Sequence, residues 1–94
     1  GLVGSATPNG WNGPDQKFVP DFGINEGFYY MSGAQLIDGE IKVRQNDAWG
    51  VNYGDDGADG TMEANGANIA VSAGTYNITL DFSVDPPTIS MVQW

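Results

Sequence analysis

The clearest pattern in the chain is an alternation of apolar and polar residues near its C-terminal end. Apolar side chains at positions 76, 78, 80, 82 and 84 alternate with polar side chains at positions 75, 77, 79, 81 and 83. A period of two places successive side chains on opposite faces of an extended strand. The pattern therefore predicts a strand with one buried face and one face in contact with water.

A second alternation covers residues 39–44, GEIKVR. Ile41 and Val43 would face one way, and Glu40, Lys42 and Arg44 the other. From position 46 the period is lost, and Asn, Asp and Gly dominate as far as position 60. This composition predicts a long irregular loop that carries Trp49 and Tyr53.

Shorter strands are expected around residues 17–19, 26–32, 69–71 and 88–94. Pro20 should lie at a sheet edge or a bulge, because proline cannot donate to the strand ladder. In the stretch EGFYYMS we expect Tyr30 in the core and Tyr29 as a lesser candidate for ligand contact. Trp94, at the end of a strand, is expected in the core or at the terminus rather than in a site.

No helical period extends over ten residues. Turn signals separate about seven to eight short antiparallel strands at a spacing of roughly ten residues. The chain is therefore predicted to be all-β, an immunoglobulin-like β-sandwich in which residues 1–94 form one domain.

Charge and composition exclude several functions. The 94 residues carry 12 acidic and three basic side chains, a net charge of -9. Nucleic acid binding needs basic residues that displace counterions, and an anionic membrane surface would be repelled. Cysteine and histidine are absent, which excludes disulfides, thiolate metal sites and nucleophile–histidine catalysis. No apolar run is long enough for a membrane span, and the start GLVGSATP lacks a signal peptide pattern, so we expect a processed fragment or an excised domain.

The acidic residues do not single out a catalytic pair, so we expect no enzymatic activity. Asp55, Gly57 and Asp59 are spaced by two and followed by Gly60, which resembles the ligand spacing of a calcium loop. Gly66 stands where the closing bidentate acid of such a loop would be. We therefore expect no cofactor, with calcium at Asp55 and Asp59 as a weaker candidate beside a solvated acidic turn.

Trp11 and Trp49 carry the strongest binding signal. Turn-forming residues surround Trp11, and Trp49 follows the basic strand residues Lys42 and Arg44. Sugars present flat C–H faces that stack on aromatic rings, and their hydroxyl rims pair with amides and charged groups. The alternatives are that both tryptophans cover the ends of the core and that Lys42 and Arg44 are solvated charges paired with nearby acids such as Glu40.

Three blocks carry a family resemblance in a fixed order over nearly the whole chain. They are GWNGPDQKF, DGEIKVRQNDAWGVNYGDDG, and GANIAVSAGTYNITLDF with the following TISMVQW. Together they resemble one carbohydrate-binding domain of the SusE/SusF type, found in surface lipoproteins of Gram-negative starch-utilisation systems. The resemblance implies a noncatalytic starch-binding β-sandwich, one of several domains of a longer parent lipoprotein anchored in the outer membrane at the cell surface.

Matched by motif, the resemblance implies ligand contacts at five positions. These are Trp11, Lys42, Arg44, Trp49 and Asn68. The NYG element, residues 52–54, is read as more structural, and Val43 stands where the family often has an aromatic residue.

The function expected from the sequence is noncatalytic binding of starch or a maltooligosaccharide, an α-glucan, by a monomeric domain. Trp11 and Trp49 would form the stacking platform, with Lys42, Arg44 and Asn68 bonding to hydroxyls. Three alternatives stay open: a structural spacer with both tryptophans buried, a protein-interaction domain that uses the same aromatics, and a module for another polysaccharide.

Overall fold

The computed structural model describes residues 1–8, 10–12, 15–20, 27–44, 49–56 and 60–94. Within these residues the chain forms nine strands and one 3-10 helix, η1 (Gly10–Asn12). No helix in these ranges is long and apolar enough to cross a membrane.

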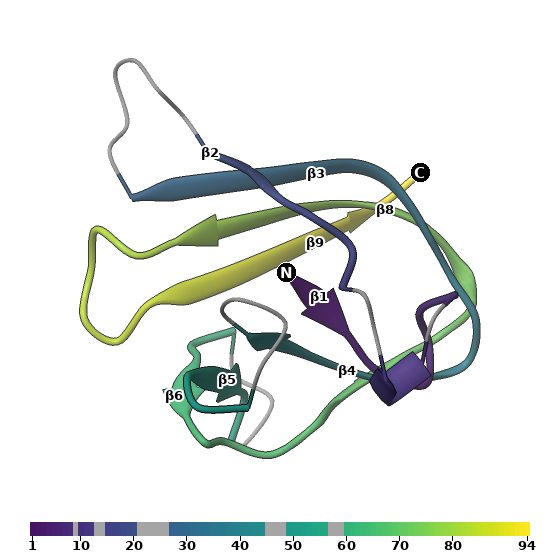
Figure 1. Cartoon of the computed structure of the whole chain (residues 1–94). Coiled ribbons are helices and arrows are strands. Elements are labelled where there is room, and N and C mark those ends of the chain that lie inside the picture. Colours follow the sequence, from purple (N-terminus) through teal and green to yellow (C-terminus); the bar gives the residue numbers. More distant parts are fainter. Residues whose placement is uncertain (9, 13–14, 21–26, 45–48, 57–59) are drawn as a thin grey trace.

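The strands form two antiparallel sheets that face each other (Figure 1). The first sheet has the order β1-β4-β5-β6, and β7 also pairs with β4. Its strands are β1 (Leu2–Val3), β4 (Gly39–Arg44), β5 (Asn52–Gly54), β6 (Glu63–Ala64) and β7 (Ile69–Val71). The second sheet has the order β2-β3-β8-β9. Its strands are β2 (Val19–Pro20), β3 (Phe28–Leu36), β8 (Gly74–Asp81) and β9 (Thr88–Gln93).

This architecture confirms the predicted all-β sandwich. The predicted alternations correspond to β8 and β4, and Pro20 lies in β2, at the edge of its sheet. The longer alternation was wrong at its end, because β8 ends at Asp81 and Val84, expected on the buried face, is 46% exposed. The irregular loop expected as far as position 60 is interrupted by β5, which contains Tyr53. The strand number is nine rather than seven to eight within the described residues. The difference comes from very short strands such as β1 and β6, which are too short to leave a period in the sequence.

The core lies between the two sheets. Ile78 and Leu80 of β8 are 1% and 2% exposed, and Ile41 and Val43 of β4 belong to the same apolar cluster. Each such side chain contributes about 2 kcal/mol of transfer free energy when it leaves water. The outward positions of β8 and β4 consequently lie on the two outer faces of the sandwich.

The tyrosines of β3 differ from the sequence expectation, since neither belongs to the apolar core cluster and Tyr29 is 36% exposed. Tyr29 pairs with the buried Leu80, whereas Tyr30 pairs with Thr79 on the outer face. The expectation that Tyr30 belongs to the core was wrong, because alternation separates two faces but only the register with β8 decides which face is inside. Trp94, expected in the core or at the terminus, is not a core residue: it follows β9 and is 74% exposed.

The turn before η1 depends on Gly4. Its φ of 143° is unfavourable for other residues, and a Cβ at this position would lie 2.1 Å from the Glu40 carbonyl oxygen of β4. Thr7 donates both its backbone N–H (3.0 Å) and its hydroxyl (2.8 Å) to the Gly4 carbonyl. This close packing against β4 fixes the segment that leads into Trp11.

Candidate functional site

Trp11 and Trp49 lie side by side in the structure. Their ring centroids are 5.9 Å apart, and their planes are tilted by 37°. Trp11 is part of η1, whereas Trp49 lies shortly before β5. Trp49 is 44% exposed and Trp11 is partly buried. The two rings form a tilted pair with accessible surface, named here the tryptophan platform.

The two basic residues of β4 lie against the Trp49 ring. The Arg44 Cζ is 4.7 Å from the ring centroid, and the Lys42 Nζ is 5.9 Å from it. Both distances lie within the range of cation–π attraction, which contributes about 0.5–2 kcal/mol depending on exposure. The cations therefore stabilise the position of the ring on the outer face of β4.

Arg44 is held by a buried carboxylate. Its Nε donates to Asp15 Oδ1 (2.9 Å) and Oδ2 (2.7 Å), and its Nη2 donates to Oδ1 at 2.7 Å. The side chains of Arg44 and Asp15 are only 4% and 0% exposed. A charge-assisted contact of this kind fixes the plane of the guanidinium group. The ion pair thus fixes the cation that lies against Trp49.

Lys42 is held by an amide that also supports Trp49. Its Nζ donates to Asn52 Oδ1 at 2.7 Å. The Asn52 Nδ2 donates in turn to the Trp49 carbonyl and to Asn65 Oδ1, each at 3.0 Å. Asn52 therefore links the β4 lysine to the backbone of Trp49 and to a turn after β6.

These contacts correct the expected role of the basic residues. Lys42 is 9% exposed and Arg44 is 4% exposed, and both donate to acceptors of the protein itself. The sequence suggested solvent-facing charges that bond directly to a ligand. The outer face of β4 was correctly assigned, but Asp15 and Trp49 cover it. Alternation in a strand defines a face and carries no information about what packs on it.

Asn68 lies at the margin of this arrangement. It is exposed, immediately precedes β7, and its Nδ2 donates to Glu40 Oε1 at 3.4 Å. Glu40 is four positions from Arg44 on β4, about 13 Å at the rise of a strand. Asn68 is thus associated with the opposite end of β4 from the Arg44–Asp15 pair.

The calcium hypothesis receives no support from the described part of the loop. Asp55 Oδ2 accepts the Gly60 N–H at 3.0 Å, and Asp56 Oδ1 accepts the Ala67 N–H at 2.8 Å. These carboxylates therefore bond to backbone groups of the turn. Asp59 lies outside the described residues. Among the residues that are described, no group of three or more acidic side chains could hold a metal ion.

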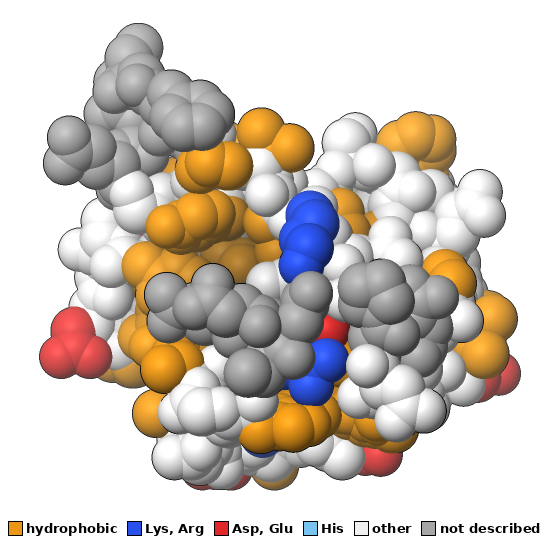
Figure 2. All heavy atoms as spheres, in the orientation of Figure 1, with side chains coloured by type: hydrophobic (Ala, Val, Ile, Leu, Met, Phe, Trp, Pro, Cys, Tyr) orange, Lys and Arg blue, Asp and Glu red, His pale blue; other side chains and the backbone are white. Residues whose placement is uncertain are grey.

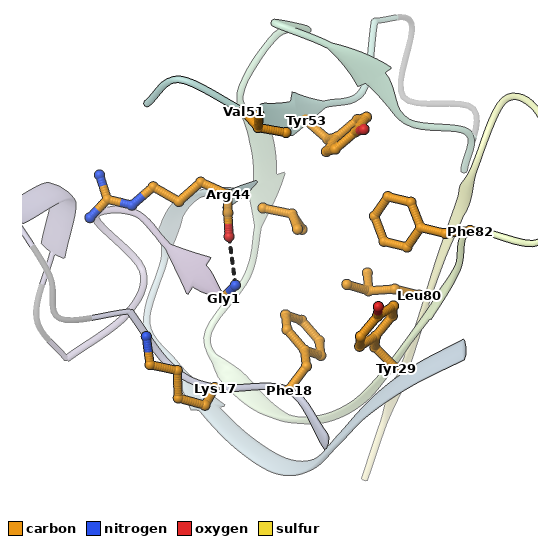
Figure 3. Close-up of a pocket in the computed structure, with 10 residues that line it drawn as sticks. Gly1, Lys17, Phe18, Tyr29, Arg44, Val51, Tyr53, Leu80 and Phe82 are labelled. Atoms are coloured by element: carbon orange, nitrogen blue, oxygen red, sulfur yellow. Dashed lines mark hydrogen bonds between the residues drawn. The ribbon is translucent and has the colours of Figure 1, made fainter. Parts of the chain in front are cut away.

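A cleft opens between the two sheets, and Arg44 of β4 is among the residues that line it. Its volume is about 440 Å³, and Figure 2 shows apolar side chains gathered around it. Phe18, Tyr29, Tyr53 and Phe82 point into it, whereas the Arg44 side chain points away (Figure 3). Phe82 makes edge contacts with Tyr29 and Tyr53, at centroid distances of 5.7 and 5.3 Å. Core residues line its inner part, so this cleft is a gap at the open end of the sandwich core.

Comparisons with protein-family models, curated proteins and solved structures found no match.

Of the two residues that hold the platform, the sequence missed Asp15, whereas Asn52 belongs to the NYG element that was read as structural. Asp15 and Asn52 are buried polar residues, and each reaches its basic partner from outside β4. Asp15 lies 29 positions from Arg44, and no local pattern links two residues at that separation. The three basic residues of the chain could have indicated such partners, because a buried cation requires a carboxylate or amide beside it. Such a rule predicts that a partner exists, but not which residue supplies it.

Proposed function

We propose that this chain is a noncatalytic carbohydrate-binding module that binds starch or a maltooligosaccharide through the tryptophan platform. The observation that carries the proposal is the adjacency of two partly accessible indole rings, 5.9 Å apart and tilted by 37°. Indole rings offer large apolar faces for the C–H surfaces of sugars.

The tilt favours an α-glucan over a flat polymer. Two coplanar rings would suit a ribbon whose sugar faces lie in one plane. Rings inclined by 37° suit a chain that curves from one sugar to the next, as an α-linked glucan does. Selectivity therefore depends on the angle between the rings and not only on their presence.

The protein binds through a preformed surface. The Arg44–Asp15 pair and the Asn52 amide hold Trp49 before a ligand arrives, so little ordering is required on binding. If each ring covers about 100 Å² of sugar surface, it contributes about 2.5 kcal/mol before the entropic cost of association. We therefore expect a dissociation constant between about 1 μM and 1 mM.

The SusE/SusF resemblance supports the same ligand and extends the proposal to the setting. It places the module in a longer lipoprotein at the surface of a Gram-negative bacterium, with neighbouring domains and without catalytic activity. Trp11, Lys42, Arg44 and Trp49 are the motif positions that lie together in the structure.

Affinity electrophoresis in gels with soluble starch tests this function, with calorimetry against a maltooligosaccharide as the quantitative measurement. The parent chain should be retarded, and Trp11→Ala and Trp49→Ala should each weaken binding at least about tenfold. Ile37→Ala is the matched control, because Ile37 is 63% exposed and lies outside the platform.

Gels with a soluble β-glucan test the selectivity of the platform: Trp11→Ala and Trp49→Ala should migrate in them like the parent chain. If starch does not retard the folded parent chain, the α-glucan assignment is wrong. A protein-interaction role would instead give association with a protein partner that both tryptophan variants lose. A spacer role predicts that the variants behave like the parent chain in every binding assay.

A further inference from the structure

The outer face of the second sheet carries an aromatic residue that the platform does not use. Trp94 follows β9, and its N–H donates to the Thr75 carbonyl of β8 at 2.8 Å. Its indole Nε1 donates to Asn77 Oδ1 at 2.8 Å, and its ring carbons Cζ2 and Cη2 each lie 3.3 Å from where a Cβ of Gly33 would stand. The ring therefore extends from β9 across β8 to β3, while the residue remains 74% exposed.

The Trp94 ring packs against β3 at one specific residue, Gly33. Gly33 lies at the register shift between Met31 and Ala34 of β3 and has a φ of 71°. A side chain at this position would be strained and would press against the indole. The glycine thus leaves room for the ring edge beside the backbone of β3.

The side-chain amide of Asn77 is held in one orientation beside the Trp94 ring. Its Oδ1 accepts from the Trp94 indole, from the Ser32 hydroxyl (3.2 Å) and from the Gly33 N–H (3.2 Å). Because three donors converge on this atom, it must be the oxygen of the Asn77 amide. The amide nitrogen Nδ2 therefore points away from these donors. An exposed indole and a preoriented amide therefore lie side by side.

The strand rows beside this pair carry no charged side chain, and Lys17 lines a shallow pocket with Ser32 and Gly33. The rows next to the pair contain hydroxyl, amide and apolar side chains, although the whole chain has a net charge of -9. They are Ser32, Gln35, Thr75, Thr79, Ser90 and Val92. From Thr75 to Thr79 the face extends about 13 Å along β8, and from β3 to β9 about 10 Å across. This area fits a short run of sugar rings.

We propose that this outer face, centred on Trp94 and Asn77, is a second carbohydrate-binding surface that takes an extended neutral polysaccharide lying flat on the sheet. The indole stacks on the C–H face of one sugar, and Asn77 Nδ2 and the Ser32 hydroxyl contact its hydroxyl groups. The absence of charge in these rows matches an uncharged polyhydroxylated chain, whereas a charged polymer would find no ion-pair partner in them. One open aromatic face suits a flat ribbon, in contrast to the tilted platform.

Depletion from solution by microcrystalline cellulose tests this surface. The parent chain should bind, and Trp94→Ala should weaken binding about tenfold or more while the fold is kept, because the side chain is mostly exposed. Trp11→Ala and Trp49→Ala should bind cellulose like the parent chain. Ile37→Ala, with a similarly exposed apolar side chain, is the control for nonspecific adsorption.

The variant Asn77→Asp distinguishes a ligand contact of the Asn77 amide from its role in holding the Trp94 ring. The aspartate keeps an acceptor for Trp94, Ser32 and Gly33 but removes the amide donor. We expect unchanged tryptophan fluorescence and weakened cellulose binding, whereas Asn77→Ala should change both.

Several results would overturn the proposal: no cellulose binding by the parent chain, undiminished binding by Trp94→Ala, or a Trp94-dependent dimer in sedimentation, which would assign the face to a second copy. Starch retardation depends on Trp11 and Trp49, so either proposal can fail while the other stands.

Discussion

At the scale of single residues, the Arg44–Asp15 pair combines structural and functional roles. Burial removes both charges from water, and the desolvation penalty is offset by three hydrogen bonds between them. The guanidinium also lies 4.7 Å from the Trp49 ring centroid. The stability of this region and the geometry of the platform therefore depend on the same contact.

Replacing Asp15 with Asn should destabilise the protein by about 3–5 kcal/mol, because a buried guanidinium loses its counter-charge. Urea denaturation monitored by far-UV circular dichroism measures the change. Asp85→Asn, which removes one charge from an exposed residue, should change stability by less than about 0.5 kcal/mol. Equal effects of the two substitutions would show that the ion pair has no special role.

Two glycines of the N-terminal turn should respond differently to alanine. At Gly10, with a φ of 59°, nothing lies within 4 Å of a new Cβ, so the cost is that of the left-handed conformation, about 1–2 kcal/mol. At Gly4 the Cβ would also collide with the Glu40 carbonyl, so Gly4→Ala should be clearly more destabilising. Thermal unfolding of the two variants side by side checks the order, and a smaller effect at Gly4 would contradict the close packing against β4.

At the scale of elements, β8 is the strand that connects the core with the proposed second surface. Its inward residues Ile78 and Leu80 pack in the core, while Asn77 and Thr79 lie on the outer face. It pairs with β3 on one side and β9 on the other. One strand therefore sets both the packing inside the sandwich and the row of hydroxyl and amide groups outside it.

Adjacent positions of β8 should differ strongly in their contribution to stability. Leu80→Ala should lower the free energy of unfolding by about 2–5 kcal/mol, because it removes buried methyl groups and leaves a cavity. Thr79→Ala, on the outer face, should lower it by less than about 1 kcal/mol. Chemical denaturation of both variants measures the difference, and comparable values would argue against the observed register of β3 and β8.

At the scale of the whole molecule, charge is the dominant feature. A net charge of -9 on 94 residues produces self-repulsion that is stronger in the compact state than in the expanded chain. The platform and the outer face of the second sheet, in contrast, bind through rings, amides and hydroxyls in the proposed functions. Stability and ligand binding should therefore depend on salt in different ways.

Raising sodium chloride from about 0.05 to 0.5 M should raise the melting temperature, because screening weakens the repulsion between carboxylates. The starch affinity of the platform should change less than about twofold over the same range, since the ligand is neutral. Differential scanning calorimetry and titration calorimetry measure the two responses. A steep loss of affinity with salt would instead indicate an anionic ligand.

The sequence by itself determined the fold class and the candidate platform residues. Period-two patterns in residues 39–44 and 75–84 are local consequences of strand geometry, so β4 and β8 could be read from them. Trp11 and Trp49 were singled out because turn formers and a polar loop surround them, which disfavours a central core position. Very short strands and the bulge at Gly33 left no such pattern.

Only the tertiary structure decided which partners these residues have. The register between β3 and β8 turned Tyr30 outward, and long-range contacts buried Lys42 and Arg44 beneath Trp49. The 37° tilt between Trp11 and Trp49 is likewise a property of two segments distant in the chain. The physical reason is that periodicity reports the local direction of side chains, whereas burial and ring geometry depend on segments distant in the chain that pack against them.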